Sequence, residues 1–311
     1  MILNDPLSIK GIFDVFLYFV KRKIMLKPIL FVGILCFSTS ILAAQTPYKL
    51  DTMPEGDGIV VEKFKPKYRN NRNRFTENNR IYKEKKAFLF DFHYFKDSVE
   101  KGVVVEEIVG FTDNPDKFWH FCPIDSIGKE IVTSCQLSVS DGGGGVFDKE
   151  LDTEEYQQTV ILWTYLNKND KMLTNESTGL VENESNIWLH PPRSRLFAIT
   201  EANPFPYIKT PYKIGTSWNW KLTFGGYWSH PEWLVWKGKV EATYDYKIVG
   251  EDKLETALGK LNCWIVDCVS TSRLGKTNLK AYFSEKYGFV KLDYTNIDGS
   301  KLILNLKKVS E

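Results

Sequence analysis

Residues 240–248 read VEATYDYKI, and this short stretch decides the fold. Apolar or aromatic side chains occupy every second position, and charged or polar side chains occupy the positions between them. A repeat of two residues is the period of a β-strand that buries one face. We therefore predict a strand whose buried face carries Val240, Ala242, Tyr244, Tyr246 and Ile248.

Similar patterns follow this stretch as far as the C-terminus. Further strands are expected at 261–270, 279–284, 289–294 and 302–306, with glycine-containing turns between them. Consecutive short strands of this kind form an antiparallel meander. Such a meander hides its edges by closing into a half-barrel or barrel, or by folding into a sandwich.

The chain upstream is also rich in strand patterns. Phe88, Phe90, Phe92 and Tyr94 share one parity, as the buried face of a strand does. Three more segments are rich in β-branched and aromatic residues, at 103–109, 131–139 and 158–166. We therefore predict a mainly β protein with few short helices.

Three sequence motifs in the C-terminal third, taken together, are similar to motifs of a known group of domains. They are PYKIGTSW at 211–218, ETALGKLNC at 255–263 and YFSEKYGFVK at 282–291. In this combination, residues 204–309 resemble a group of uncharacterised bacterial exported (periplasmic) domains, which are related in architecture to the half-barrels of lipoprotein-localisation carriers. The resemblance implies a long curved sheet whose concave side holds something apolar. It brings no catalytic residue with it.

The first 44 residues differ from the rest of the chain. A basic cluster (Lys21, Arg22, Lys23 and Lys27) precedes an apolar run and then small residues up to Ala44. This order is typical of a secretory signal peptide. We expect cleavage after Ala44, with Met25 as an alternative true start. The alternative interpretations of this segment are a membrane anchor and a signal that attaches a lipid to Cys36.

Removal of this leader leaves 36 basic and 37 acidic side chains, so the charge of +2 becomes a charge near −1. Nothing global then indicates a nucleic-acid partner. We expect an exported protein that is periplasmic, associated with the outer envelope or secreted, and that is not integral to a membrane after cleavage.

The mature chain is expected to have three parts. Residues 45–86 are polar and partly irregular, and the basic run at 65–80 within them reads as a solvated loop or as a contact for anionic lipid headgroups, lipopolysaccharide or nucleic acid. A β-rich N-terminal part covers 87–200, and the antiparallel module covers 201–311. Five of the thirteen prolines fall between His190 and Pro211, which predicts an extended connection and a boundary near residue 200.

Four cysteines follow the leader: Cys122, Cys135, Cys263 and Cys268. An even number in an exported chain permits disulfides. A Cys122–Cys135 bridge is sterically open, because Pro123 and Gly128 allow the chain to return. Four buried free thiols are the alternative.

Motifs that would indicate an enzyme, a metal or a cofactor are absent from the sequence. The histidines show no HxH or HExxH spacing, and there is no GxSxG elbow. The glycine-rich stretch at 141–148 lacks the Lys-Ser/Thr of a phosphate loop; a flexible hairpin is expected there, or a flap or weak calcium loop. We therefore assign no catalytic residue, metal or cofactor.

Aromatic side chains gather between residues 218 and 236, with five of the nine tryptophans among them. Such rings stack on sugars or lie at membrane interfaces, or they fill a core. The alternating stretch predicts that Trp218 and Trp220 are buried, whereas Gly225-Gly226 and Pro231 predict an exposed loop carrying Trp228 and Trp233. The candidate ligand-binding residues are Trp218, Trp220, Tyr227, Trp228, Trp233 and Trp236.

These observations favour a non-catalytic exported protein that binds an apolar or glycan-like ligand, with a lipid, a glycan or a cell-envelope protein as the partner. One alternative is an exported hydrolase whose residues converge from separate strands. Its first candidates are Asp91, His93, His120 and His230. The other alternative is a structural envelope component without a ligand.

Overall fold

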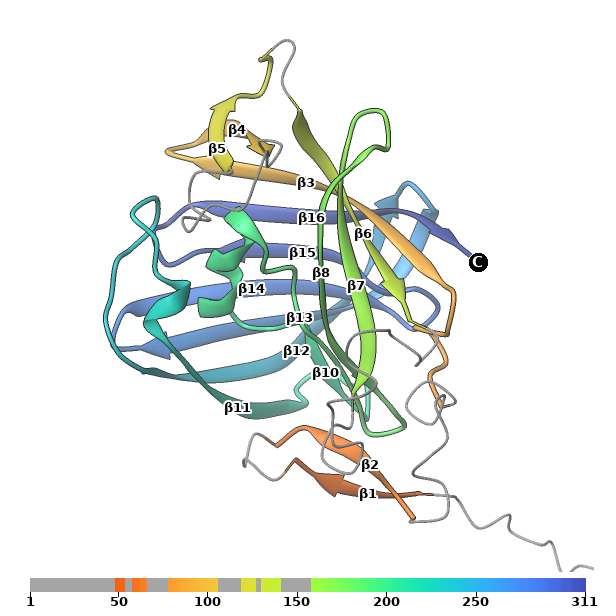
Figure 1. Cartoon of the computed structure of the whole chain (residues 1–311). Helices are drawn as coiled ribbons and strands as arrows, with labels where there is room; N and C mark the ends of the chain where they lie inside the picture. The colour runs from red at the N-terminus through yellow and green to blue at the C-terminus, as the bar shows by residue number, and fades with distance from the viewer. Residues whose placement is uncertain (1–47, 54–57, 66–77, 106–118, 127–129, 141–157) are drawn as a thin grey trace, which may run out of the picture. The chain divides into compact units, whose positions relative to one another are not determined.

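The computed structural model describes residues 48–53, 58–65, 78–105, 119–126, 130–140 and 158–311 (Figure 1). The expected leader, the glycine-rich stretch at 141–148 and most of the basic run at 65–80 lie outside the described residues. Among the residues described, no helix is both long enough and apolar enough to cross a membrane.

The C-terminal meander has the predicted order. Its strands are β11 (Ser217–Phe224), β12 (Val240–Thr256), β13 (Gly259–Ser272), β14 (Gly275–Ser284), β15 (Gly288–Thr295) and β16 (Lys301–Ser310), and each pairs antiparallel with the next. The predicted faces are confirmed, because the five alternating side chains of 240–248 are at most 2% exposed. The meander is therefore held by neighbours in the sequence.

The same sheet continues into the N-terminal half. There, β16 pairs with β3 (Ala87–Lys96), and the order runs on through β4 (Val99–Val105), β6 (Ile131–Val139), β7 (Thr159–Asn167), β8 (Met172–Glu182), β9 (Asn186–Leu189) and β10 (Tyr207–Lys209). A further strand, β5 (Trp119–Pro123), pairs with β4. All of these strands belong to one 14-stranded antiparallel sheet, which confirms the mainly β prediction.

The domain boundaries differ from those expected. Pro47–Glu311 form one compact unit, so the structure does not divide near residue 200. Within the described part of the segment 45–86, β1 (Tyr48–Thr52) and β2 (Val60–Phe64) pair as a two-stranded sheet, and residues 78–86 contain turns and bends but no strand. Farther along this segment, Tyr82 is fully buried in the core.

Ring packing brings the two ends of the large sheet together. The end strands are β10 and β11, and Tyr207 of β10 lies 5.7 Å from Trp218 of β11 between ring centroids. Next to this pair, Trp188 of β9 lies 6.0 Å from Trp220. The sheet is therefore nearly closed into a barrel, and aromatic contacts join its two ends.

The proline-rich segment does not run along the surface as an extended connection. It contains the short 3-10 helix η4 (Arg195–Ala202), and residues 201–208 are all buried. The hydroxyl of Tyr246 donates to the carbonyl of Phe205 at 2.9 Å, and that of Thr277 donates to Ala202 at 3.0 Å. This segment therefore packs against the concave side of the meander, where Figure 1 shows η4 in green. The chain itself therefore occupies part of the space expected for an apolar ligand.

Cys122 and Cys135 do not form the bridge that the sequence permits. β4 lies between their strands, because Val103 pairs with both Phe121 of β5 and Val132 of β6. Two strand spacings amount to about 9–10 Å, whereas bridged cysteines have Cα atoms roughly 4.4–6.8 Å apart. Cys122, Cys135, Cys263 and Cys268 are all buried free thiols.

Candidate functional site

Trp218 and Trp220 belong to the core. Both are buried, as predicted, and their rings stack on Tyr246 and Tyr244 at centroid distances of 5.4 Å and 4.9 Å. These partners come from β12, the neighbouring strand. The two tryptophans therefore close the barrel and present no accessible face to a ligand.

The other aromatic residues lie on the loop between β11 and β12, at 225–239. Trp233 and Trp236 are buried, and their indole N–H groups donate to the backbone carbonyls of Trp228 and Gly225 at 3.1 Å and 3.2 Å. The prediction of an exposed Trp233 is therefore wrong, because this ring anchors the loop from within. Trp228 is half-buried, and Tyr227 is 84% exposed.

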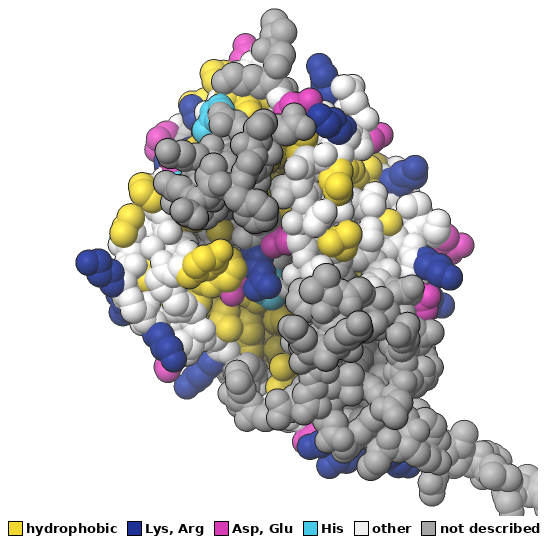
Figure 2. All heavy atoms as spheres, viewed as in Figure 1, with side chains coloured by type: hydrophobic (Ala, Val, Ile, Leu, Met, Phe, Trp, Pro, Cys, Tyr) yellow, Lys and Arg dark blue, Asp and Glu magenta, His cyan; other side chains and the backbone are white. Residues whose placement is uncertain are grey.

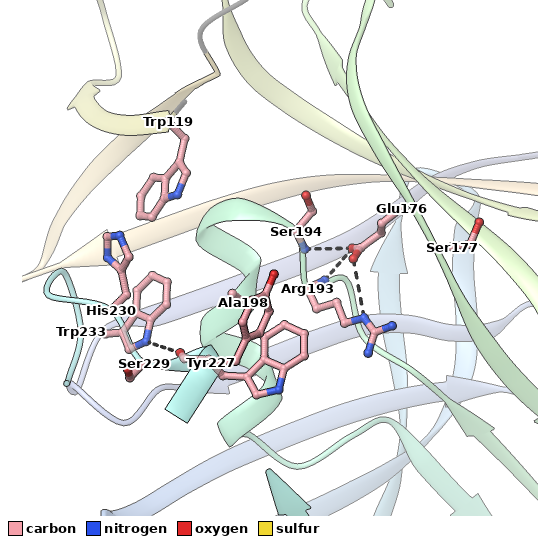
Figure 3. Close-up of a pocket in the computed structure, with 11 residues that line it drawn as sticks. Trp119, Glu176, Ser177, Arg193, Ser194, Ala198, Tyr227, Ser229, His230 and Trp233 are labelled. Carbon is pink, nitrogen blue, oxygen red and sulfur yellow. Dashed lines mark hydrogen bonds and ion pairs between the residues drawn. The ribbon is translucent and has the colours of Figure 1, made fainter. Parts of the chain in front are cut away.

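A cavity of about 400 Å³ opens between this loop and the segment around η4 (Figure 3). The loop supplies one side of it, β5 contributes a tryptophan, and β8 and the residues around the start of η4 supply the other side. Its lining consists of Trp119, Glu176, Ser177, Arg193, Ser194, Ala198, Tyr227, Trp228, Ser229, His230 and Trp233. We refer to it below as the loop pocket.

One wall of the loop pocket is a stack of rings. Trp119 and Trp233 lie nearly parallel, with centroids 6.0 Å apart. The imidazole of His230 lies 5.1 Å from Trp119 and 4.7 Å from Trp233. Tyr227 and Trp228 meet edge to face at 5.1 Å. The loop and β5 together thus present several aromatic faces to one space.

The opposite wall is polar and is organised by Glu176 of β8. Its carboxylate accepts from the backbone N–H groups of Arg193 and Ser194 at 2.6 Å and 3.0 Å, and from the hydroxyl of Tyr165 at 2.5 Å. Burial raises the pKa of Glu176 above its ordinary value. Because one oxygen, Oε1, accepts all three of these hydrogen bonds, Glu176 fixes the backbone from which Arg193 extends.

Arg193 lies between this carboxylate and the aromatic wall. Its Nε lies 3.8 Å from Glu176, and its guanidinium lies 5.5 Å from the ring centroid of Trp228, in a cation–π contact. The side chain remains about one-third exposed. Figure 2 shows basic, acidic and hydrophobic side chains close together at the centre of this face.

Two further titratable groups lie behind Arg193. Because a guanidinium only donates, the 3.3 Å contact between Arg193 Nη1 and His190 Nε2 makes that nitrogen an acceptor. The proton then lies on Nδ1, which donates to the carbonyl of Pro191 at 2.9 Å. Burial lowers the pKa of His190 to about 3, so the ring is neutral.

Glu201 of η4 lies against the same histidine. Its Oε2 is 3.5 Å from His190 Nε2, too long for a good hydrogen bond, and this oxygen has no hydrogen-bond partner. Burial raises the pKa of Glu201 to about 7. Near neutral pH the carboxyl is therefore substantially protonated and neutral, which lowers the cost of its burial.

No local motif indicates this polar group in the sequence. Glu176, His190, Arg193 and Glu201 have no recognisable spacing, and they converge only because η4 folds back against β8. The run HPPR at 190–193 is the one available signal. Two adjacent prolines indicate a rigid backbone between the histidine and the arginine. They do not indicate which distant residues contact these two side chains.

The four residues proposed for a hydrolase do not meet in one cleft. Asp91 and His93 lie on the outer face of β3, where His93 Nδ1 is 2.6 Å from Glu100 and Asp91 is 3.1 Å from Lys307. His230 lines the loop pocket. His120 follows Trp119 on β5 and points to the other face of that strand.

Asp91 also lines a second cavity of about 330 Å³ on this outer face, beside Lys291 and Asn305. In the described part of the chain, no group of three or more His, Cys, Asp or Glu side chains is placed to hold a metal ion.

Comparison with solved structures finds likeness only at low identity. A candidate lipoprotein from Parabacteroides distasonis superposes with a TM-score of 0.39 and 10% identity, over 74% of this chain and 97% of that chain. A candidate exported protein with a YmcC-like fold, from Bacteroides fragilis, gives 0.38 and 8%, over 74% and 98%. The hypothetical lipoprotein YmcC from Escherichia coli gives 0.27 and 12%, over 76% and 93%.

With TM-scores below 0.5 and identities of at most 12%, these likenesses carry no argument about this chain. No protein-family model matches the chain, and no curated protein matches it at a significant level.

Proposed function

We propose that this protein is an exported, non-catalytic binding protein of the cell envelope, and that its loop pocket takes a glycan-like ligand. The leader-like segment at 1–44 supports export. The observation that carries the binding role is the pairing of an aromatic wall with a polar wall across one cavity of about 400 Å³. This size falls within the range of roughly 300–1,000 Å³ that is usual for ligand pockets.

The two walls suit the two kinds of surface on a sugar. A pyranose ring has apolar C–H faces, which stack on indole and phenol rings such as Trp228 and Tyr227. Its hydroxyl groups both donate and accept hydrogen bonds. Across the pocket, the guanidinium of Arg193 can donate to them, and the hydroxyls of Ser177 and Ser194 can do both.

A purely apolar ligand fits this pocket less well. Such a ligand would remove water from Arg193 and Glu176 without replacing the lost hydrogen bonds, which is costly. Beside η4, the buried residues 201–208 take up room on the concave side of the sheet, where the sequence led us to expect an apolar ligand. Of the two ligand classes expected from the sequence, the glycan-like one therefore agrees better with the geometry.

Calorimetry of the exported protein against a panel of mono- to tetrasaccharides tests this proposal. We expect Trp228→Ala to weaken binding by about tenfold or more, since stacking on an aromatic ring contributes roughly 0.5–1.5 kcal/mol beyond the area that it buries. Trp264→Ala is the matched control. That ring is also half-buried, but it lies outside the pocket, beside Tyr212 and Glu285.

Two results would count against the proposal. One is that no saccharide binds, which would favour a structural envelope component without a ligand. The other is an equal loss in both tryptophan variants, because Trp264 does not line the pocket.

A further inference from the structure

Four turns lie together at one end of the large sheet. The strand ends pair as Phe224 with Val240, Ser272 with Gly275, Thr295 with Lys301, and Lys96 with Val99. Adjacent hairpins are in register as well, because Ala242 pairs with Ser272 and Lys301 with Phe95. We call residues 96–99, 225–240, 272–276 and 295–301 the pocket rim, since the loop 225–239 also lines the loop pocket.

Large apolar side chains are exposed on the pocket rim. Tyr227 is 84% exposed, Val235 62%, Val99 53% and Leu234 36%. Four of the nine exposed large hydrophobic residues of the described chain therefore lie on this one rim. Scattered single cases need no explanation, but a gathering of them usually marks a contact surface.

The loop holds Leu234 and Val235 outward. Their neighbours Trp233 and Trp236 are buried and bonded to backbone carbonyls of the loop. The backbone of Leu234 exchanges two hydrogen bonds with that of His230, at 2.9 Å and 3.1 Å. With both tryptophans turned inward, the residues between them face solvent.

The pocket rim is also basic. It contains six lysine and arginine residues and three acidic residues. Two of the acidic residues, Glu232 and Asp298, lie within 3.8 Å of Lys96. The guanidinium of Arg273 donates to the carbonyl of Lys237 at 2.6 Å, which brings the turn after β13 against the loop. Exposed Lys237, Lys239 and Lys276 complete this basic surface around Leu234 and Val235.

We propose that the pocket rim docks on a lipid bilayer with anionic headgroups. Exposed apolar side chains flanked by lysines match the two layers of such a surface, because the apolar tips enter the interface and the ammonium groups remain among the headgroup phosphates. The charge complementarity is local, since the chain without residues 1–44 has a net charge near −1. Docking would place the mouth of the loop pocket beside the headgroups.

Co-sedimentation with phosphatidylcholine vesicles, with and without phosphatidylglycerol, tests this docking. Every protein is the full chain expressed in a host that exports it, so that residues 1–44 are treated alike throughout. We expect binding only to the vesicles that contain phosphatidylglycerol, and weaker binding as salt is added. The double variants Leu234→Ser/Val235→Ser and Lys237→Glu/Lys239→Glu should each weaken binding by about tenfold or more.

Matched controls come from elsewhere on the surface. Ile214→Ser changes a side chain that is 58% exposed and precedes β11, at the opposite end of that strand from the loop. Lys253→Glu reverses an exposed charge on β12 near its turn with β13. Both controls should bind like the unchanged protein, and all variants should keep its melting temperature.

The proposal is overturned if the unchanged protein ignores phosphatidylglycerol, or if rim and control variants bind equally well or equally poorly. It is independent of the pocket ligand, because Leu234, Val235, Lys237 and Lys239 do not line the loop pocket.

Discussion

The meander β11–β16 and the irregular segments that pack against it are stabilised in different ways. In the meander, each strand bonds to its neighbour in the sequence, and alternation alone separates core from solvent. At 78–82 and 183–208 the backbone has few such ladders, and individual polar side chains replace them. Glu182 accepts from the backbone N–H groups of Arg80, Ile81 and Tyr82, each at 2.9 Å.

Asparagine and threonine side chains also form hydrogen bonds in place of strand pairing along these segments. The side-chain amide of Asn186 accepts from the N–H of Val60 at 2.8 Å and donates to its carbonyl at 2.9 Å, as a strand residue would. Thr200 donates to Pro192 at 2.6 Å, and Asn203 donates to Asn296 at 2.6 Å. Buried backbone groups must be paired. A barrel filled by irregular chain therefore depends on single side chains, whereas the meander depends on a repeated pattern.

Glu182→Ala is the variant with the largest expected effect on this difference between the irregular segments and the meander. The substitution leaves three backbone N–H groups without their acceptor, two of them in buried contacts, and Glu182 itself is only 4% exposed. We expect a loss of about 3–5 kcal/mol in the free energy of unfolding, which is the usual cost of removing one member of a buried, hydrogen-bonded charged pair. Urea denaturation measures this loss.

Glu241→Ala in the meander provides the comparison. That side chain is exposed on β12, so its removal should change the free energy of unfolding by less than about 0.5 kcal/mol. Similar losses in the two variants would show that buried side-chain acceptors matter no more here than exposed glutamates do.

The same difference explains which parts of the fold could be predicted. The alternation of Val240 to Ile248 and of Phe88 to Tyr94 is visible within ten residues, and both faces are as expected. The partners of Glu182 and Asn186 lie about 100 or more residues away in the sequence. No local sequence pattern predicts a contact between residues so far apart. The packing of residues 190–208 inside the barrel therefore could not be predicted from the sequence. The prolines there predict an extended connection, whereas the segment contains the 3-10 helix η4 and the short strand β10 and is largely buried.

The candidate site divides in the same way. A dense run of aromatic residues directs attention to the loop 225–239, and Tyr227, Trp228 and Trp233 line the loop pocket. Its other wall comes from Glu176 and Arg193, whose convergence depends on the long-range packing of η4. The burial of Trp233 was missed because glycine and proline indicate a loop, but not which of its side chains turn inward.

A pH titration sharpens the comparison through Glu201. Burial raises the pKa of this carboxyl from 4.5 to about 7. Between these values the folded protein holds a proton that the unfolded chain releases. The stabilisation from this proton is therefore complete below about pH 4.5, declines as the pH rises, and is lost above about pH 7.

Glu201→Gln mimics the protonated carboxyl at every pH. We expect the variant to match the unchanged protein near pH 4.5 and to exceed it in free energy of unfolding by about 3 kcal/mol above pH 7. The contribution of His190, whose pKa burial lowers to about 3, opposes that of Glu201 in acid but is shared by both proteins. Glu251→Gln, at an exposed site on β12, should show no such trend. A difference that stays constant with pH would mean that Glu201 ionises normally.

Two glycines at turns of the meander test the contact between the meander and the irregular segments, because an irregular segment contacts only one of them. Gly259 and Gly288 both have a left-handed backbone, with φ of +96° and +77°. A Cβ on Gly259 would meet open space, whereas one on Gly288 would lie only 2.7 Å from Cζ of the buried Tyr82 and closer still to its hydroxyl oxygen. That hydroxyl accepts from the N–H of Phe289 at 3.1 Å, which ties the segment 78–82 to the turn.

Alanine at either position incurs the backbone strain of about 1–2 kcal/mol. At Gly288 the methyl group must also displace Tyr82, which adds about 1–3 kcal/mol of overpacking. Gly288→Ala should therefore lower the free energy of unfolding by more than Gly259→Ala does, and Tyr82→Phe should lose only the hydrogen bond, about 1 kcal/mol. In the double variant Tyr82→Ala/Gly288→Ala, the penalty of the added methyl group should fall to that at Gly259, because the space is then free. An unchanged penalty would place the strain in the turn alone and would remove Tyr82 as the link between the two regions.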